Sequence, residues 1–141
     1  MKQEDNELLL KDLCARLPYG VKCKYYDVYE NCYEEGTVLG VERKEYIEID
    51  GRCVNVEEVK PYLFPLSSMT EEQKKDIFRN GTFFFDRHNT LCRLPKHNDD
   101  YDYVTFEDYL EITEKLNKNH LDYRGLIPKG LAIDATDKNI Y

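Results

Sequence analysis

The sequence predicts an α+β domain in which a small antiparallel sheet or SH3-like barrel is preceded by a helix and followed by two helices and a hairpin. Apolar residues at helical spacing come first, short alternating segments with turn signals follow, and helical patterns return in the second half. With 141 residues the chain has the size of a single domain. We divide it into residues 1–66, the N-terminal helix and β module, and residues 67–141, a helix, a hairpin, a second helix and a packed tail.

A helix is predicted over residues 4–17. Its apolar face consists of residues that recur at helical spacing, namely Leu9, Leu10, Leu13 and Leu17. The other side, which we expect to face solvent, carries Lys11, Asp12 and Arg16. Pro18 disfavours a helical conformation in the residue before it, and Gly20 accepts turn geometry, so the helix ends there.

Two strands are predicted next. Residues 21–29 alternate apolar and polar side chains at their start, which is the period of a half-buried strand. Residues 31–35 form a polar connection, and residues 36–43 make the second strand. Gly40 lies inside that strand, where a glycine typically marks a bulge or a sharp bend.

The clearest local signal is a β-hairpin over residues 45–56. Asp50 and Gly51 are preferred in a two-residue hairpin turn, because both turn positions need positive φ. The cross-strand pairs that such a turn sets are Ile47 with Val54, which we place on the core face, and Glu48 with Cys53.

The β module ends with a short strand over residues 60–64, after a turn at Glu57 and Glu58. Pro61 and Pro65 lack the N–H group that a strand donates, so we place this strand at an edge of the sheet. The number and spacing of the strands resemble those of an SH3-like barrel, and an open antiparallel sheet fits the same pattern. The sequence does not decide between the two.

Residues 59–73 join the two halves of the chain. Their apolar side chains, which we expect to pack between the halves, are Val59, Tyr62, Leu63, Leu66 and Met69. A helix follows, and capping-box spacing occurs twice at its start, for Ser68 with Glu71 and for Thr70 with Gln73. We expect this helix to end near residue 79, before an Asn-Gly pair.

The second half continues with a hairpin, a helix and a tail. Residues 82–86 and 90–94 are predicted to pair as strands, and Thr105 to cap the last helix. The buried stripe of that helix is predicted as Phe106, Tyr109, Leu110, Thr113 and Leu116. The apolar tail residues expected to pack on the body are Leu126, Ile127, Leu131 and Ile133.

Charge restricts the classes of partner. The formal net charge is −8 and the pI is about 4.9, which disfavours nucleic acid and anionic membrane surfaces and suits a basic protein. No apolar run is long enough to cross a membrane, and the first residues do not resemble a signal peptide. We therefore expect a cytoplasmic protein. The five cysteines, with no C-x-x-C pair, are expected to be buried reduced thiols.

Three stretches resemble a family of small uncharacterised proteins from Bacteroides and their phages and mobile elements. They are L-P-Y-G-V at residues 17–21, V-K-P-Y-L-F-P-L-S-S-M-T-E-E at residues 59–72 and H-L-D-Y-R-G-L-I-P-K-G-L-A at residues 120–132. The resemblance implies a mobile-element setting in a bacterial cytoplasm, or a host cytoplasm for a phage-encoded protein. It implies no activity, no cofactor and no functional residues. We identify no resemblance to the family in residues 78–103, which are expected to be its variable part.

One segment has the residue types of a metal or acid–base site. His88 follows Asp86 closely, and His97 and Asp99 come soon after. Two imidazoles and two carboxylates on one loop face are able to hold a metal ion or transfer protons. The ordinary interpretation is a polar hairpin tip. No phosphate-binding glycine loop, nucleophile elbow or zinc spacing occurs elsewhere.

The twelve tyrosines indicate a contact surface, because tyrosine is amphipathic and is enriched in protein interfaces. The candidate binding residues combine tyrosines with neighbouring acids: Tyr26, Tyr33, Glu34, Glu35, Asp99, Asp100 and Tyr101. They suit a basic protein partner. The competing interpretation is that these tyrosines cover the core and place their hydroxyl groups at its rim.

The sequence favours a non-enzymatic protein-interaction module of a mobile element or phage. One alternative is a protein that binds or sequesters a small ligand such as a nucleotide signal. Another is a metal-dependent hydrolase built on His88 and His97. Binding of nucleic acid requires that the basic side chains meet on one face, and these are Lys22, Lys24, Arg43, Lys44 and Arg52.

Overall fold

The computed structural model describes residues 2–94 and 104–141. The helices are α1 (Gln3–Arg16), α2 (Glu71–Ile77) and α3 (Phe106–Lys118), with single 3₁₀ turns η1 (Leu17–Tyr19), η2 (Val56–Glu58) and η3 (Leu66–Ser68). The strands are β1 (Lys22–Asp27), β2 (Cys32–Glu42), β3 (Tyr46–Ile49), β4 (Arg52–Asn55), β5 (Val59–Pro65), β6 (Phe83–Phe85), β7 (Leu91–Arg93), β8 (Leu121–Asp122) and β9 (Ile133–Asp134). The predicted α+β class is confirmed.

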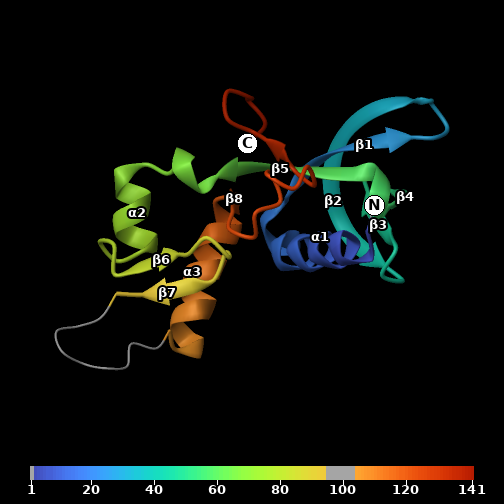
Figure 1. The fold of residues 1–141 in the computed structure, drawn as a ribbon. Coiled ribbons are helices and arrows are strands. Elements are labelled where there is room, and N and C mark those ends of the chain that lie inside the picture. The colour runs from blue at the N-terminus through green and yellow to red at the C-terminus, as the bar shows by residue number, and fades with distance from the viewer. Residues whose placement is uncertain (1, 95–103) are drawn as a thin grey trace.

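The main sheet has the strand order β4-β3-β2-β1-β5-β8, and β9 also pairs with β5. Strands β1 to β5 pair antiparallel, whereas β8 and β9 run parallel to β5. Among the described residues no strand pairing joins β4 to the other edge, so the sheet is open and no closed barrel forms. Figure 1 shows α1 beside the β module at one end, and α2, α3 and the β6–β7 hairpin at the other.

The predicted hairpin at Asp50 and Gly51 is confirmed. Their φ angles are 49° and 85°, and the register pairs Ile47 with Val54 across the core face. The pairing of β2 with β3 shifts between Val38 and Gly40, which confirms a bulge there.

The predicted connection at residues 31–35 is wrong, because β2 begins at Cys32 and pairs with β1 as far as Asp27. The chain reverses through residues 28–31, where Asn31 has a φ of 53°. A short turn therefore leaves the polar residues in a strand. Such a strand has no apolar alternation because both of its faces are exposed there.

The placement of β5 at an edge is also wrong. Its ladder with β1 ends at Pro61, and β9 and β8 flank the remainder. The Phe64 N–H donates to His120 O at 2.8 Å, and Leu63 O accepts from the Ala135 N–H at 2.8 Å. The prolines end one ladder without excluding another, because the partner strand changes along β5.

The predicted caps of α2 and α3 agree with the structure better than the predicted placement of the strands does. The Thr70 hydroxyl accepts from the Gln73 N–H at 3.1 Å, and Gln73 Oε1 accepts from the Thr70 N–H at 2.9 Å, which is a complete capping box. Ser68 instead donates to Pro65 O. Thr105 caps α3 as predicted, since its hydroxyl accepts from the Asp108 N–H at 3.1 Å.

The predicted stripe of α3 is only half right. Thr113 and Leu116 are buried, as are Ile112 and Asn117. The exposed fractions contradict the rest of the stripe: 75% for Phe106, 39% for Tyr109 and 48% for Leu110. Only the C-terminal half of α3 packs on the body. Its first turns face solvent among the described residues, so the prediction from periodicity extended the buried stripe too far towards the N-terminus of the helix.

The core consists of two apolar clusters. The first lies between α1 and the sheet, and it includes Leu126 and Leu131 from the tail, which confirms that the tail packs on the body. The second lies among α2, α3 and the β6–β7 hairpin, and Phe64 and Leu66 pack against it. Because β5 contributes to both clusters, the expected packing of residues 59–69 between the halves is confirmed.

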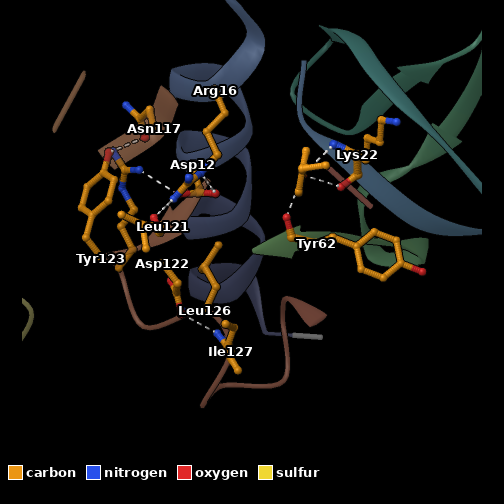
Figure 2. A network of polar contacts seen from close by, with 12 residues as sticks. Asp12, Arg16, Lys22, Tyr62, Asn117, Leu121, Asp122, Tyr123, Leu126 and Ile127 are labelled. Carbon is orange, nitrogen blue, oxygen red and sulfur yellow. Dashed lines mark hydrogen bonds and ion pairs between the residues drawn. The ribbon is translucent and has the colours of Figure 1, made fainter. Parts of the chain in front are cut away.

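Asp12 and Arg16 are fully buried, so the prediction that they face solvent is wrong. Arg16 Nε donates to Asp12 Oδ2 at 2.8 Å, and Arg16 Nη2 donates to Leu121 O at 2.7 Å. Arg124 Nη1 donates to Asp12 Oδ1 at 2.8 Å. Figure 2 shows this network between α1 and the segment that follows α3. That segment covers the polar side of α1 and supplies hydrogen-bond partners to Asp12 and Arg16.

The same segment is fixed by further contacts. Both arginines lie over the Tyr123 ring, with Cζ-to-centroid distances of 5.5 Å for Arg16 and 4.5 Å for Arg124. The Tyr123 hydroxyl donates to Asn117 Oδ1 at 2.9 Å. The Asp122 carboxylate accepts two backbone N–H groups, from residues 126 and 127, each at 2.9 Å. The stretch at residues 120–132 is therefore a structural clamp.

We predict that Asp12→Ala costs roughly 3–5 kcal/mol of unfolding free energy, because it leaves two buried or half-buried guanidinium groups without their carboxylate. Urea denaturation measures the loss. Asp76→Ala is the matched control: it breaks a largely exposed pair with Lys115 and costs less than about 1 kcal/mol. Equal losses for the two variants would contradict the role given to Asp12.

We predict that Gly36→Ala destabilises the fold by about 1–3 kcal/mol. A Cβ atom at this position lies 2.5 Å from Asp50 Oδ2 and 2.6 Å from Ile49 Cγ2, so β2 has to move away from the β3–β4 turn. Gly40→Ala is the control, because its nearest neighbour is a Glu48 carboxylate oxygen at 3.4 Å. Thermal melts of both variants measure the difference, and an unchanged Gly36→Ala melt would refute the crowding argument.

Candidate functional site

Tyr26 and Tyr33 lie opposite each other on β1 and β2, as cross-strand partners. Their ring centroids are 5.2 Å apart and the planes meet at 71°, an edge-to-face arrangement. Lys24 Nζ lies 4.8 Å from the Tyr33 ring centroid. Tyr33 is 65% exposed and Tyr26 is half-buried, so two of the three predicted aromatic residues lie together on this hairpin.

The predicted acids do not all belong to that surface. Glu34 is exposed on β2 beside Tyr33. Glu35 instead accepts a hydrogen bond from the Tyr62 hydroxyl at 2.7 Å. Burial, and next the Glu35 carboxylate, raise the pKa of Tyr62 to about 12. Asp99, Asp100 and Tyr101 lie outside the described residues.

A tyrosine pocket that the sequence did not predict lies next to this pair. It is a cavity of about 220 Å³, and its lining includes Tyr25, Tyr26, Val28, Tyr29, Tyr46 and Glu58. Val28 is 70% exposed and Tyr29 is 88% exposed, although both are apolar or aromatic. The run Y-Y-D-V-Y, ending in a turn, was the available signal, since aromatic residues at a hairpin end have no core to enter.

Asp27 positions the pocket. Its Oδ1 accepts the N–H groups of Tyr29 at 2.9 Å and Glu30 at 3.3 Å, which fixes the turn after β1. Its Oδ2 pairs with the Arg52 guanidinium, which reaches across from β4. Asp27 is 3% exposed, whereas the Arg52 side chain is 45% exposed. One buried carboxylate thus holds both the hairpin end and a half-exposed guanidinium beside the cavity.

The chemistry of the tyrosine pocket is that of recognition. Its walls are aromatic rings with apolar faces, Arg52 supplies N–H donors, and Glu58 supplies a carboxylate. Burial raises the pKa of Tyr25, although the Arg52 charge lowers it, so the phenol stays protonated near neutral pH. Groups of these types are able to contact and orient a ligand.

His88 serves the β6–β7 turn. Asp86 Oδ1 accepts the N–H groups of His88 at 2.8 Å and Thr90 at 3.0 Å, and these bonds lower the pKa of Asp86. The Arg87 Nε–H donates to His88 Nε2 at 3.2 Å. His97 and Asp99 lie outside the described residues. Within residues 2–94 and 104–141 no three His, Cys, Asp or Glu side chains are grouped to hold a metal ion.

The basic side chains named for nucleic-acid binding line four different hollows. Arg43 and Lys44 line a hollow against α1, and Arg52 lines the tyrosine pocket. Lys24 and Lys22 each line a further, separate hollow. A continuous cationic path for a phosphate backbone requires a different arrangement.

The expectation of buried cysteines holds for Cys23 alone. Burial raises the pKa of its thiol to about 12. Cys14, Cys32 and Cys53 are exposed. The Cys32 and Cys53 thiols donate to Glu34 and Glu42 at 3.3 Å, and these bonds raise their pKa. A raised pKa makes a thiol a poor nucleophile at neutral pH.

His120 borders a second hollow, of about 470 Å³, that also includes Phe64 and Tyr141. Its ring stacks on Tyr141, with centroids 3.7 Å apart and planes at 12°. The Tyr141 hydroxyl donates to Tyr62 O at 2.8 Å and accepts from the Lys22 N–H at 2.9 Å, which clips β1 to β5. Burial, and next the Arg16 charge, lower the pKa of His120 to about 4.

Comparison with known proteins gives no significant match to a family model, a curated protein or a solved structure. Across the described ranges, no helix has both the length and the apolar character needed to cross a membrane. The function therefore has to be argued from the surface geometry.

We predict that stability falls between about pH 6.5 and pH 4 partly through His120. Because its pKa is lower in the folded state, its contribution is complete above pH 6.5 and is lost as pH falls through 4. The loss is on the order of 2 kcal/mol, allowing for partial exposure.

Urea midpoints measured between pH 4 and pH 7 test this, with carboxylates titrating in every variant. His120→Phe keeps an aromatic partner for Tyr141 and flattens the profile relative to wild type. His88→Gln, at an exposed position, leaves the profile unchanged. A His120→Phe profile as steep as that of wild type would show that His120 does not contribute.

Proposed function

We propose that the chain is a non-enzymatic protein-interaction module, encoded in a mobile-element or phage setting as the family resemblance implies. The observation that carries the proposal is the clustering of exposed aromatic and apolar side chains at one end of the β module. Tyr29, Val28, Tyr33 and Tyr46 are 88%, 70%, 65% and 39% exposed. We refer to these four residues as the hairpin patch.

The size of the tyrosine pocket favours a protein segment over a small ligand. Its volume of about 220 Å³ is below the roughly 300–1,000 Å³ that is typical of small-molecule sites. A single side chain fits such a volume, whereas a nucleotide does not. A protein partner fills the pocket with one residue and covers the hairpin patch with its neighbours.

The hairpin patch also has the composition of an energetically important contact. Tyrosine presents a large amphipathic surface with few rotatable bonds, and it is enriched among residues that dominate binding energy. Asp27 fixes the turn that carries Val28 and Tyr29, so little backbone conformational entropy is lost on binding. The exposed carboxylates of Glu30, Glu34 and Glu58 flank these residues.

Selection of peptides from a random display library on the purified chain tests the proposal. We predict that enriched peptides bind with micromolar or better Kd. The double variant Tyr29→Ala/Tyr46→Ala weakens their binding by at least about tenfold, which corresponds to 1.4 kcal/mol. Isothermal titration measures the affinities.

Phe106→Ala is the matched control, because Phe106 is 75% exposed on α3, at the other end of the molecule. It leaves the peptide affinities unchanged. A library that yields no enriched peptide, or peptides that bind equally well to the double variant, would refute the proposed function.

A further inference from the structure

The tyrosine pocket carries an inference about the chemistry of its partner, which rests on the proposed function. The cavity has apolar walls of tyrosine rings and Val54, and two polar groups of opposite sign line it. One is the Arg52 guanidinium and the other is the Glu58 carboxylate. A ligand that satisfies all three features has an apolar group, a hydrogen-bond acceptor and a cation.

Asp27 holds the Arg52 guanidinium in a position where its remaining N–H groups can donate hydrogen bonds to a ligand. Its ion pair with the buried Asp27 fixes one side of the guanidinium, while 45% of the side chain stays exposed. A guanidinium has five N–H donors, so one carboxylate leaves several free. Because Asp27 already neutralises the charge, a neutral acceptor such as a main-chain carbonyl suits these donors better than a second carboxylate.

Glu58 is available for a cation. It is exposed, and among the described residues it takes part in no ion pair. Glu57 is its exposed neighbour in sequence, and Lys24 and Lys60 line a separate hollow that Glu57 and Glu58 also border. The charged residues that line the tyrosine pocket are Asp27, Arg52 and Glu58, which leaves one negative charge in excess, and the whole chain carries a formal net charge of −8. Charge complementarity therefore selects a Lys or Arg side chain at this end.

We propose that the occupant is an extended, basic segment of a partner protein. One aliphatic side chain enters the tyrosine pocket, the adjacent main-chain carbonyl accepts from Arg52, and a flanking Lys or Arg pairs with Glu58. The fixed positions of Arg52 and Glu58 set the direction of the segment. Its apolar residue supplies burial, and its cation supplies selectivity and rapid association.

Synthetic peptides of equal length test this, each with a central Leu, Ala or Asp and with either Lys or Glu flanks. NMR titration of the ¹⁵N-labelled full chain measures Kd and identifies the shifted amides. The peptide with Leu and Lys flanks binds most tightly and shifts residues 27–29 and 52–58. Central Ala or Glu flanks each weaken binding by at least about tenfold.

Two conservative variants distinguish the proposed contacts of Arg52 and Glu58 from non-specific hydrophobic binding. Arg52→Lys keeps the positive charge beside Asp27 but loses the donor fork, and Glu58→Gln keeps the shape but loses the charge. Arg52→Lys weakens every Leu peptide about equally, whereas Glu58→Gln weakens only those with Lys flanks and removes their salt dependence. Thermal melts confirm that both variants are folded.

Equal binding of Lys-flanked and Glu-flanked peptides at the tyrosines would overturn this inference and leave the proposed function standing. Tight binding of the Asp peptide, or unchanged affinities in Arg52→Lys, would overturn the assigned role of Arg52. Absence of binding by the whole peptide set would overturn the inference as well. The display selection separately decides whether the chain binds protein segments at all.

Discussion

The structure depends on one buried charge, the guanidinium of Arg16. An unpaired buried ion costs several kcal/mol, so α1 cannot pack on the sheet unless Asp12 and Leu121 O accept from Arg16, and Asp12 in turn accepts from Arg124. These partners come from both ends of the chain: Asp12 and Arg124 are 112 residues apart. The network therefore couples formation of the first helix to the arrival of the segment after α3, and partial assembly is penalised.

This coupling explains how two separate apolar clusters behave as parts of one fold. Arg16 bonds to Leu121 O in β8, β8 pairs with β5, and β5 reaches both clusters. Tyr141 adds a clip from the tail to β1 and β5. The short parallel strands β8 and β9 contribute little pairing of their own, and the buried charges and apolar tail residues hold them in place. Because the segments after α3 pack beside β5 and run parallel to it, the sheet contains both parallel and antiparallel pairs.

Local signals in the sequence were sufficient to predict turns, helix caps and a bulge, which depend on residues that are close in the sequence. The Asp50–Gly51 turn, the Thr70 and Thr105 caps and the Gly40 bulge were all predictable, because the residues that define them are adjacent. The buried role of Arg16 was not, since its partners are distant in sequence and a charged residue opposite a leucine stripe normally faces water. The exposure of the first turns of α3 was not predictable either. Periodicity indicates which residues share a face of a helix, but it does not indicate how much of that face other segments cover.

The tyrosine pocket, in contrast to the clamp, depends on residues from one part of the sequence, between positions 25 and 58. The tyrosine pocket is built from a short turn, a β-hairpin and one ion pair, Asp27 with Arg52, where the sheet remains open. These contacts involve β1, the turn after it and β4, whereas the clamp joins α1 to the segment that follows α3 (Figure 2). Exposed side chains there contribute little to the core, so they are free to change with the partner while the fold stays fixed. The stretches at residues 59–72 and 120–132 form the connector and the clamp, and none of their residues lines the tyrosine pocket. The scaffold and the candidate surface are therefore set by different parts of the sequence.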